Sequence, residues 1–366
     1  MTTTPSNLII TTRGSVIENT HILHLAITDV SGNLVSSLGD PHRTTLIRSC
    51  AKPLQALAII ESGALELYDL DDKDLAIACA SHNAEPTHLE RARGILEKAG
   101  LREDDLMCGG HASLLQSVND SRTKEGTQIS AILSNCSGKH AAMLAAAKAI
   151  GTPLEGYHEL EHPIQQRVKK IVEETAGVPP EDIQWAIDGC NMATPAYSLD
   201  LMAKTFAAFA AAADEVAAYP EKATQRTKNM ARVYHVMIKH ADMVAGTKRY
   251  CTEMMYAQKG TMFGKIGADA CYAFGIRESE RTRRILGCGG AMGIAAKVED
   301  GNLAMLYAAL EEILEQLDLS TQEAARKMTH WHHPRLTNTM DIVIGHVAFP
   351  FKVKLDSVAT KAKVEA

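Results

Sequence analysis

Basic clusters and long apolar runs are both missing from this sequence, and each absence excludes a class of protein. The formal net charge is −6, and no run of Lys and Arg interleaved with aromatic residues is present. Proteins that bind nucleic acid usually carry a basic face, so we expect no nucleic-acid partner. The longest apolar segments, such as 206–213, are far shorter than the roughly 20 residues that cross a bilayer, so we expect no membrane partner.

Signals for secretion are also missing. Residues 1–7 have neither the charged region nor the apolar stretch of a signal peptide. Eight cysteines are scattered over 366 residues without a C-x-x-C pair, which is more typical of thiols than of disulfides. We therefore expect a cytoplasmic protein, a location that counts against a role in the cell wall. With 46% hydrophobic and 22% charged residues, the chain has the composition of a globular protein with a large core.

The order of predicted elements indicates the fold class. Short strands punctuated by Gly and Asn are predicted over 7–38, helices over most of 49–245, strands again over 261–296, and a last long helix over 303–317. This order favours an α+β fold with an antiparallel sheet built from both chain ends and a helical middle. Because no linker or repeat is evident, we expect a single domain over 1–366, with an α/β lobe from both chain ends and a helical lobe.

Several segments give more specific expectations. Residues 107–127 are rich in Gly, Ser and Asn and are predicted to form a long loop, which is either a surface excursion or a flap over the site. A glycine-rich stretch near the C-terminus lacks the spacing of a dinucleotide fingerprint and indicates close strand packing. The expected elements are a loop over 107–127, a strand over 129–133, a helix over 221–245, close packing over 287–293, a histidine-rich loop over 330–334 and an edge strand over 341–347.

The main chemical signal is Ser49 followed by Lys52, in the pattern S-x-x-K. Pro53 is tolerated only in the first turn of a helix, so a helix should begin close to Ser49. Ser49 Oγ and Lys52 Nζ would then share one helix face. A lysine with a lowered pKa can remove the proton that makes a serine hydroxyl a poor nucleophile. Taken alone, the pair is more typical of a capping serine and a solvated lysine than of a catalytic pair.

Two further motifs strengthen this interpretation. Ser81 and Asn83 form an S-x-N, and Lys265 and Gly267 form a K-x-G. The chain order S-x-x-K, S-x-N, K-x-G matches that of the penicillin-recognising serine enzymes. Serine acyl transfer is therefore the leading hypothesis from the residues themselves.

A second constellation contains two cysteines. Cys136 precedes a predicted helix, where a thiolate is stabilised, and Cys190 follows a predicted strand. The two thiols could converge on a metal, most plausibly zinc, or could be buried and inert. Spacing alone favours buried, inert thiols over a shared metal.

Four motifs together resemble a known family, the rhizobial-type L-asparaginases, also called the asparaginase II family. They are Arg48-Ser49-Cys50-Ala51-Lys52-Pro53, Ala80-Ser81-His82-Asn83-Ala84-Glu85-Pro86, Cys136-Ser137-Gly138-Lys139-His140 and Asp188-Gly189-Cys190. The similarity runs through nearly the whole chain. It implies a fold of the serine β-lactamase, penicillin-binding-protein and glutaminase type, and a homodimer.

The resemblance also implies roles for individual residues. Ser49 would be the nucleophile and Lys52 its base, and Ser81 and Lys265 would form a second Ser–Lys pair. The implied metal is zinc, and the implied pocket binds a small-molecule substrate. The zinc ligands would be Cys136, Lys139 and Cys190, and the pocket residues would be Arg48, His140 and Asp188.

These assignments predict a reaction. Ser49 would attack the side-chain amide of L-asparagine and form an acyl-enzyme, and water would then release L-aspartate. A glutaminase differs by one methylene in the substrate, and the sequence does not show the size of the pocket. The same motifs would also suit a β-lactamase-like serine amidohydrolase, or a non-catalytic protein that binds zinc or an amino acid.

Overall fold

The computed structural model describes residues 7–355 and divides the chain into two compact units. One unit contains the large sheet and draws on both chain ends, and the other is mainly helical. The predicted α+β fold, with an antiparallel sheet built from both chain ends and a helical middle, is confirmed. The sheet unit comprises Met1–Ile47, Tyr197–Ala218 and Glu253–Ala366, and the helical unit comprises Arg48–Ala196 and Tyr219–Thr252.

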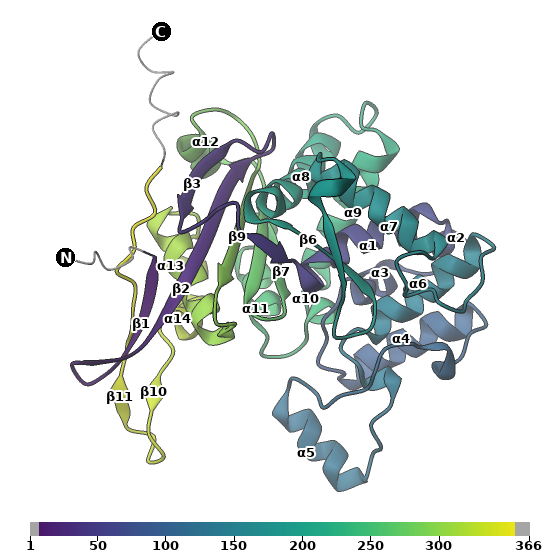
Figure 1. Ribbon diagram of the computed structural model, residues 1–366, viewed down its shortest axis with the longest axis horizontal. Coiled ribbons are helices and arrows are strands. Elements are labelled where there is room, and N and C mark those ends of the chain that lie inside the picture. The colour runs from purple at the N-terminus through teal and green to yellow at the C-terminus, as the bar shows by residue number, and fades with distance from the viewer. Residues whose placement is uncertain (1–6, 356–366) are drawn as a thin grey trace. The chain divides into compact units, whose positions relative to one another are not determined.

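The sheet unit is organised around an antiparallel sheet (Figure 1). Among the described residues it has seven strands in the order β12-β1-β2-β9-β8-β7, with β3 also paired to β2. The first half of the long strand β2 pairs with β1, and its second half pairs with β9 and β3. The strands are β1 (Leu8–Arg13), β2 (Val16–Asp29), β3 (Leu34–Leu38), β7 (Met262–Gly267), β8 (Cys271–Ile276), β9 (Met292–Val298) and β12 (Val347–Ala348).

The helix α8 (Leu199–Ala218) lies against β9, β8 and β2. Every residue of β7, β8 and β9 is buried, as expected for strands that are covered on both faces. A Cβ atom at Gly293 would lie 1.8 Å from the carbonyl oxygen of Ala203 on α8, and one at Gly275 would lie 2.2 Å from that of Phe206. Glycine at these two positions therefore lets the helix approach the sheet closely.

The rest of the sheet unit corrects three expectations. The helix over 303–317 is present as α13 but is followed by α14, so it is not the last helix, and the histidine-rich stretch is mostly helical rather than a loop. The glycine-rich stretch is preceded by the short helix α12. The expected edge strand is two short strands, of which β12 lies beside β1 at the sheet edge. The elements are α12 (Glu280–Leu286), α13 (Leu303–Gln316), α14 (Gln322–His332), β4 (Thr44–Leu46), β10 (Leu336–Thr337) and β11 (Val343–Gly345).

The helical unit has α1 and the alanine-rich α6 in its core. Nine of the ten residues of α1 and eleven of the thirteen of α6 are buried. The helix α6 packs against α4, α3 and α1, and α1 packs also against α7 and α9. The helices are α1 (Lys52–Glu61), α2 (Ala64–Leu67), α3 (Asp72–Ala78), α4 (Pro86–Lys98), α5 (Gln116–Glu125), α6 (Ser137–Ala149), α7 (Pro163–Ala176), α9 (Gln225–Lys239) and α10 (Ala241–Val244).

Short elements complete this unit. The hairpin of β5 and β6 turns at Asp188 to Asn191, and β6 and α11 run across the boundaries between the units. These elements are β5 (Gln184–Ile187), β6 (Ala193–Ser198), α11 (Tyr250–Ala257) and the 3-10 turns η1 (Arg48–Ala51), η2 (Glu103–Asp105), η3 (Ala131–Leu133) and η4 (Pro180–Asp182).

Local signals set several helix ends. Asp71 caps α3, because its carboxylate accepts hydrogen bonds from the backbone N–H groups of Lys73 and Asp74. Proline opens α4 and α7, where a missing N–H costs nothing. Gly177 ends α7 with a left-handed φ of 69°.

Three expectations for the helical unit are wrong. The segment 107–127 is not only a loop, because it contains α5. The run 129–133 is not a strand, because 131–133 form the 3-10 turn η3. A single helix was expected over 221–245, but the observed α9 is shorter. It ends at Lys239 with His240 as its C-cap, and α10 follows.

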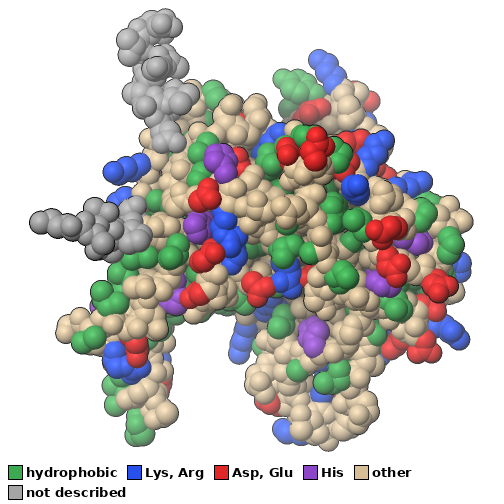
Figure 2. All heavy atoms as spheres, in the orientation of Figure 1, with side chains coloured by type: hydrophobic (Ala, Val, Ile, Leu, Met, Phe, Trp, Pro, Cys, Tyr) green, Lys and Arg blue, Asp and Glu red, His purple; other side chains and the backbone are tan. Residues whose placement is uncertain are grey.

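The outer surface carries mixed charges. On the face drawn in Figure 2, acidic and basic side chains are interspersed, without a continuous basic patch. Within residues 7–355, none of the helices combines the length and the apolar character that a bilayer crossing requires.

Candidate active site

The turn η1 runs directly into α1 and carries the S-x-x-K motif. Pro53 lies in the first turn of α1, so the prediction that a helix begins close to Ser49 is confirmed. Arg48 has a φ of 50°, a left-handed conformation that is costly for a residue with a Cβ atom and is common at functional sites. Ser49 is half-buried, whereas the side chain of Lys52 is only 1% exposed.

The amine of Lys52 contacts three groups from two other segments. Its Nζ donates to the carbonyl oxygen of Ala80, to Ser81 Oγ at 2.9 Å and to Cys136 Sγ at 3.1 Å. Within residues 7–355 we find no hydrogen bond between Ser49 Oγ and Lys52 Nζ, so the hydroxyl bound to this amine is that of Ser81. The structure therefore brings Lys52 together with the S-x-N motif and with one of the two candidate cysteines.

The cysteine constellation converges next to Lys52. Cys136 immediately precedes α6, Lys139 lies in the first turn of α6, and Cys190 lies in the turn between β5 and β6. Lys139 Nζ is 3.0 Å from Cys190 Sγ, and Lys52 Nζ is 3.1 Å from Cys136 Sγ. All three side chains are buried, so the cluster is a compact set of two sulfur atoms and one nitrogen.

Protons are unequally distributed in this cluster. The hydrogen bond from Cys190, together with the charges of Lys52 and Lys139, lowers the pKa of Cys136 well below its ordinary value although burial opposes this. The same hydrogen bond and burial raise the pKa of Cys190. Burial disfavours the charge of Lys139, but the two cysteines outweigh burial and raise its pKa. Of the two thiols, Cys136 is therefore the one that loses its proton more readily.

The first turn of α6 requires a glycine. A Cβ atom on Gly138 would lie 2.5 Å from the side chain of Ile77 and 2.7 Å from its carbonyl oxygen on α3. Glycine lets the two helices approach closely, so that Cys136 and Lys139 sit near the segment after α3 that carries Ser81. The positive end of the α6 dipole also stabilises a thiolate at Cys136.

Arg48 and Asp188 form an ion pair. Arg48 Nε is 2.5 Å from Asp188 Oδ1, and the backbone N–H of Gly189 donates to the same oxygen at 2.8 Å. Burial opposes the carboxylate charge, but Lys139 and Arg48 outweigh it and lower the pKa of Asp188. Asp188 Oδ2 also lies 3.6 Å from Cys190 Sγ. The site thus presents a guanidinium and a carboxylate side by side, next to the cysteine cluster.

His140 occupies the position after Lys139 and is completely buried. Burial and the charges of Lys139 and Lys52 lower its pKa well below the ordinary value, so the ring is neutral. Its Nδ1 lies 2.6 Å from the hydroxyl of Tyr157, which also accepts a hydrogen bond from the Met107 N–H at 3.0 Å. Burial raises the pKa of Tyr157. The sequence analysis missed Tyr157, and no local pattern marks it, because its partner lies 17 positions away.

Lys265, the remaining predicted residue, belongs to the sheet unit. It lies in β7 with its side chain 0% exposed, and its Nζ donates to the carbonyl oxygen of Ile266 at 3.0 Å. The other nine predicted residues all belong to the helical unit. A lysine whose side chain is completely buried is rare without a role, so the burial of Lys265 is consistent with function.

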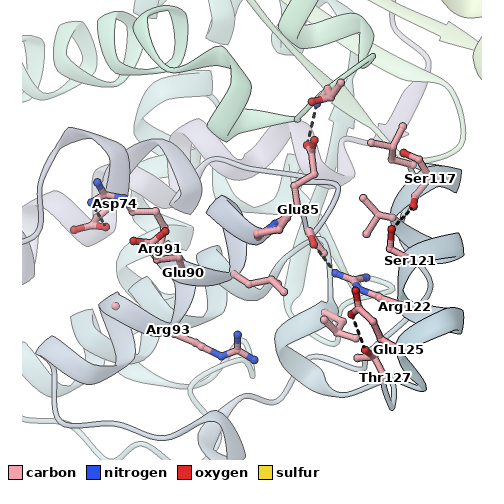
Figure 3. Close-up of a pocket in the computed structure, with 18 of the residues that line it drawn as sticks. Asp74, Glu85, Glu90, Arg91, Arg93, Ser117, Ser121, Arg122, Glu125 and Thr127 are labelled. Carbon is pink, nitrogen blue, oxygen red and sulfur yellow. Dashed lines mark hydrogen bonds and ion pairs between the residues drawn. The ribbon is translucent and has the colours of Figure 1, made fainter.

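A large pocket of the helical unit lies away from these residues. It has a volume of about 1200 Å³ between α4 and α5, and it is lined by side chains of both charges, among them Glu85, Arg91 and Arg122 (Figure 3). None of the ten predicted site residues lines it. Arg91 is already paired with Asp71 and Asp74, so the charges that line the pocket partly neutralise one another.

Two other histidine-containing patterns could hold a metal by their residue types. The stretch from His158 to His162 has the spacing H-E-x-x-H, but it forms turns rather than a helix, and both ring nitrogens of His162 already bond to the backbone. In the sheet unit, ligand atoms of Glu312, Glu315 and His332 lie within 4.8 Å of one another. Both nitrogens of His332 contact these carboxylates, which makes the group a bridge between α13 and α14.

Comparison with known proteins agrees with the motifs. A family model described as L-asparaginase II matches residues 9–349. A comparison with curated proteins found no match.

Proposed function

Because the chain belongs to the L-asparaginase II family, we propose that it hydrolyses the side-chain amide of L-asparagine through an acyl-enzyme on Ser49. Membership in this family makes the chain an amidohydrolase with a small-molecule substrate. The observation that carries the finer proposal is the buried amine of Lys52, which lies one turn after Ser49 and donates to the hydroxyl of Ser81. An amine in such a position can exchange protons with hydroxyl groups on either side of it.

Acylation begins when the Lys52 amine, in its neutral form, takes the proton of Ser49. The Ser49 oxygen attacks the amide carbon of asparagine, and backbone N–H groups at the start of α1 stabilise the oxyanion. The proton passes to the leaving nitrogen, and ammonia departs. Water then attacks the ester, which releases aspartate and restores Ser49. The net reaction consumes one water and yields one ammonia and one aspartate.

Ser81 and Lys265 form the second Ser–Lys pair of the proposal. Ser81 Oγ accepts a hydrogen bond from Lys52 and so orients that amine. Lys265 lies in the sheet unit. Its proposed role rests on the resemblance and on the complete burial of its side chain.

Arg48, Asp188 and His140 supply the recognition of substrate. Free asparagine carries an α-carboxylate and an α-ammonium, and the ion pair of Arg48 and Asp188 offers one charge of each sign. Substrate would bind by exchanging this internal ion pair for two contacts with its own charges. A neutral His140, whose Nδ1 is already bonded to Tyr157, has Nε2 to offer to a substrate oxygen or nitrogen.

Zinc fits the cluster of Cys136, Lys139 and Cys190. The donors are two sulfur atoms and a nitrogen, which are ligand types that zinc accepts, and Lys139 Nζ already lies 3.0 Å from Cys190 Sγ. A bound zinc ion would supply a positive charge that fixes the loop of Cys190 against α6. Lys139 would have to give up its proton to bind, which makes binding stronger as pH rises.

The decisive experiment is the Ser49→Ala variant. We expect no ammonia release from L-asparagine, because the hydroxyl that forms the ester is missing, and an unchanged melting temperature, because Ser49 is half-buried at a helix start. Ser62→Ala, at the other end of α1, is the matched control: its hydroxyl caps Ile59 O at 2.7 Å, and its loss should leave turnover unchanged. Ammonia release by Ser49→Ala at the wild-type rate would remove Ser49 from the mechanism.

The same assay separates the competing functions. Ammonia release from L-glutamine at a rate equal to that from L-asparagine would indicate a glutaminase, and hydrolysis of nitrocefin would indicate a β-lactamase. Binding of asparagine or zinc by a protein that releases no ammonia would indicate a non-catalytic binder. The homodimer implied by the resemblance stays a prediction, which light scattering on the purified protein tests.

A further inference from the structure

The segment that carries Ser81 is buried but has no regular secondary structure. Ser81 to Ala84 are at most 4% exposed, and none of them belongs to a helix or a strand. A buried backbone outside helices and sheets must find other partners for its polar groups. The N–H of Ser81 donates to Val244 O at 2.9 Å, and the N–H of His82 donates to Asn135 O at 3.1 Å. This irregular segment is therefore held in place by hydrogen bonds to other segments of the chain.

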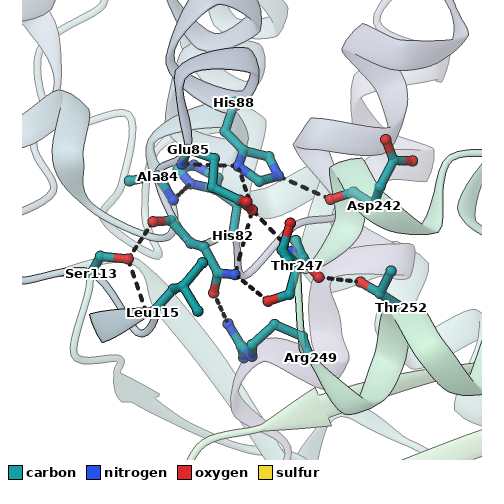
Figure 4. Close-up of polar contacts among 12 residues, drawn as sticks. His82, Ala84, Glu85, His88, Ser113, Leu115, Asp242, Thr247, Arg249 and Thr252 are labelled. Atoms are coloured by element: carbon teal, nitrogen blue, oxygen red, sulfur yellow. Dashed lines mark hydrogen bonds and ion pairs between the residues drawn. The ribbon is translucent and has the colours of Figure 1, made fainter. Parts of the chain in front are cut away.

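Side chains, rather than backbone groups, bind three carbonyl oxygens of this segment. The three donors belong to separate segments of the helical unit, and two of them, Ser113 and Arg249, are labelled in Figure 4. They are Arg249 on Ser81 O at 3.1 Å, Ser113 on Asn83 O at 2.5 Å and Arg122 on Ala84 O. The first of these is the bond closest to the reactive atoms, because it acts on Ser81 itself.

Arg249 makes a second bond that fixes its position. Its Nη1 also donates to Asn83 Oδ1 at 3.0 Å, and Asn83 Nδ2 in turn donates to the carbonyl oxygen of Thr247 at 2.9 Å. The side chain of Asn83 thus bonds to both Arg249 and Thr247, and the backbone from Thr247 to Arg249 closes this ring of contacts (Figure 4). Gly246 makes this ring possible, since a Cβ atom there would lie 2.7 Å from Asn83 Nδ2. The guanidinium is therefore pre-oriented before it meets the Ser81 carbonyl.

We propose that Arg249 is a positioning residue that holds Ser81 Oγ against the amine of Lys52. The Ser81 backbone is bound at both its N–H, by Val244, and its C=O, by Arg249, and its Oγ is 2.9 Å from Lys52 Nζ. Without Arg249 one of these two backbone anchors is lost. This inference rests on the proposed function, in which Ser81 and Lys52 belong to the reacting set.

The expected effect falls on turnover rather than on binding. A misplacement of about 1 Å in a reacting group can lower a rate by roughly 10²-fold. Arg249 has no contact with Arg48 or Asp188, the proposed substrate-binding pair, among the bonds found in residues 7–355. We therefore expect Arg249→Ala to lower kcat for asparagine by roughly 10- to 100-fold and to leave KM within about threefold of the wild-type value.

Rescue separates positioning from a purely structural role. Added guanidinium ion should restore part of the kcat of Arg249→Ala, because it can occupy the space left by the side chain, and it should not help Ser81→Ala. Arg249→Lys keeps the charge and one donor and should retain more activity than Arg249→Ala. The matched control is Lys248→Gln, which removes the charge of the exposed neighbouring residue and should keep wild-type kcat.

A double-mutant cycle adds a second readout. Asn83→Ala removes the group that orients Arg249, so its effect on kcat and that of Arg249→Ala should be less than additive in the double variant. The proposal is overturned if Arg249→Ala keeps kcat within threefold of wild type, if the loss lies in KM alone, or if guanidinium rescues nothing and the two losses simply add. If Arg249→Ala fails to fold, the same criteria apply to Arg249→Lys. Absence of ammonia release by the wild-type protein would instead count against the proposed function.

Discussion

Replacement of Lys52 by methionine separates chemistry from stability. Methionine has a similar length and no amine, so Lys52→Met removes the three hydrogen bonds of Nζ without leaving a large cavity. The oxygen atoms of Ala80 and Ser81 each lose this donor, at a cost of about 1–3 kcal/mol per group. Burial of the amine is itself unfavourable, by several kcal/mol if it is charged, and this cost disappears in the variant. We expect the free energy of unfolding to change by less than about 2 kcal/mol.

Catalysis should respond much more strongly to the same change. A positioned general base contributes about 10²–10⁴-fold to a rate. A loss of 10³-fold corresponds to about 4 kcal/mol of activation free energy, which is larger than the expected change in stability. Ammonia release from asparagine and urea denaturation of the same preparation measure the two quantities.

The matched control is Lys148→Met. Lys148 lies on α6 in the same unit, and its Nζ donates to the carbonyl oxygens of Ala99 at 2.7 Å and Gly100 at 3.4 Å. It therefore also loses bonds to backbone carbonyls, but its exposed side chain lies among no predicted site residues. Turnover by Lys52→Met within tenfold of wild type would refute its role as the base. A loss of more than about 4 kcal/mol in stability would show that the amine is structural.

Three further predictions concern the fold and the proposed metal. Gly293→Ala should lower the free energy of unfolding by at least ~1–3 kcal/mol in urea denaturation, because its Cβ would overlap the Ala203 carbonyl oxygen. Asp71→Ala should cost about 1 kcal/mol through loss of the α3 cap. Burial acts to raise the pKa of Asp71, but backbone hydrogen bonds and Arg91 outweigh it, so the pKa is lowered from 3.8; the cap contribution is therefore full above that pH and is lost as pH falls below it. Cys190→Ser should reduce the zinc content of the purified protein, as measured by mass spectrometry. The control variant Ser62→Ala changes no proposed zinc ligand and should leave the zinc content unchanged.

Local chemistry made much of the fold predictable. The starts of α1, α4 and α7 each carry a proline that only the first turn of a helix accepts, and Asp71 is a strong capping residue. These signals act within a few residues and need no knowledge of the rest of the chain. The starts of these helices can therefore be located from the sequence alone.

Segments without such signals were misassigned for identifiable reasons. The helix α5 has a polar sequence without an apolar face, although Gly126, with a φ of 65°, is a recognisable C-terminal stop. The run 129–133 is too short for periodicity to separate a strand from a turn. The helix α14 begins at Thr321, whose hydroxyl accepts from the Ala324 N–H at 3.1 Å, a capping signal that could have identified it.

The contacts of the site could not be predicted by the same means. Lys52 and Cys136 are 84 positions apart, and Lys139 and Cys190 are 51 apart. Their approach depends on how α1, α3 and α6 pack, which no local pattern records. Tyr157 and Arg249 belong to no motif and became visible only through their bonds to His140 and Ser81. The motifs therefore predicted residues that are proposed to carry chemistry, but not the residues that hold them in place.

The packing also joins two assignments that the sequence kept separate. Cys136 Sγ contacts the amine of Lys52 at 3.1 Å and is also one of the three proposed zinc ligands, so one sulfur atom belongs to both the proposed base and the proposed zinc cluster. Any change in the charge on that sulfur must alter the electrostatic environment of Lys52, because the two atoms are in contact in a buried site. A group bound by the cysteines therefore does not need to touch substrate in order to affect turnover. For the same reason, a loss of activity in a Cys136 or a Cys190 variant does not by itself assign a catalytic role to zinc, whereas a loss of turnover in the wild-type protein that follows chelation, and that added zinc reverses, would implicate the metal itself.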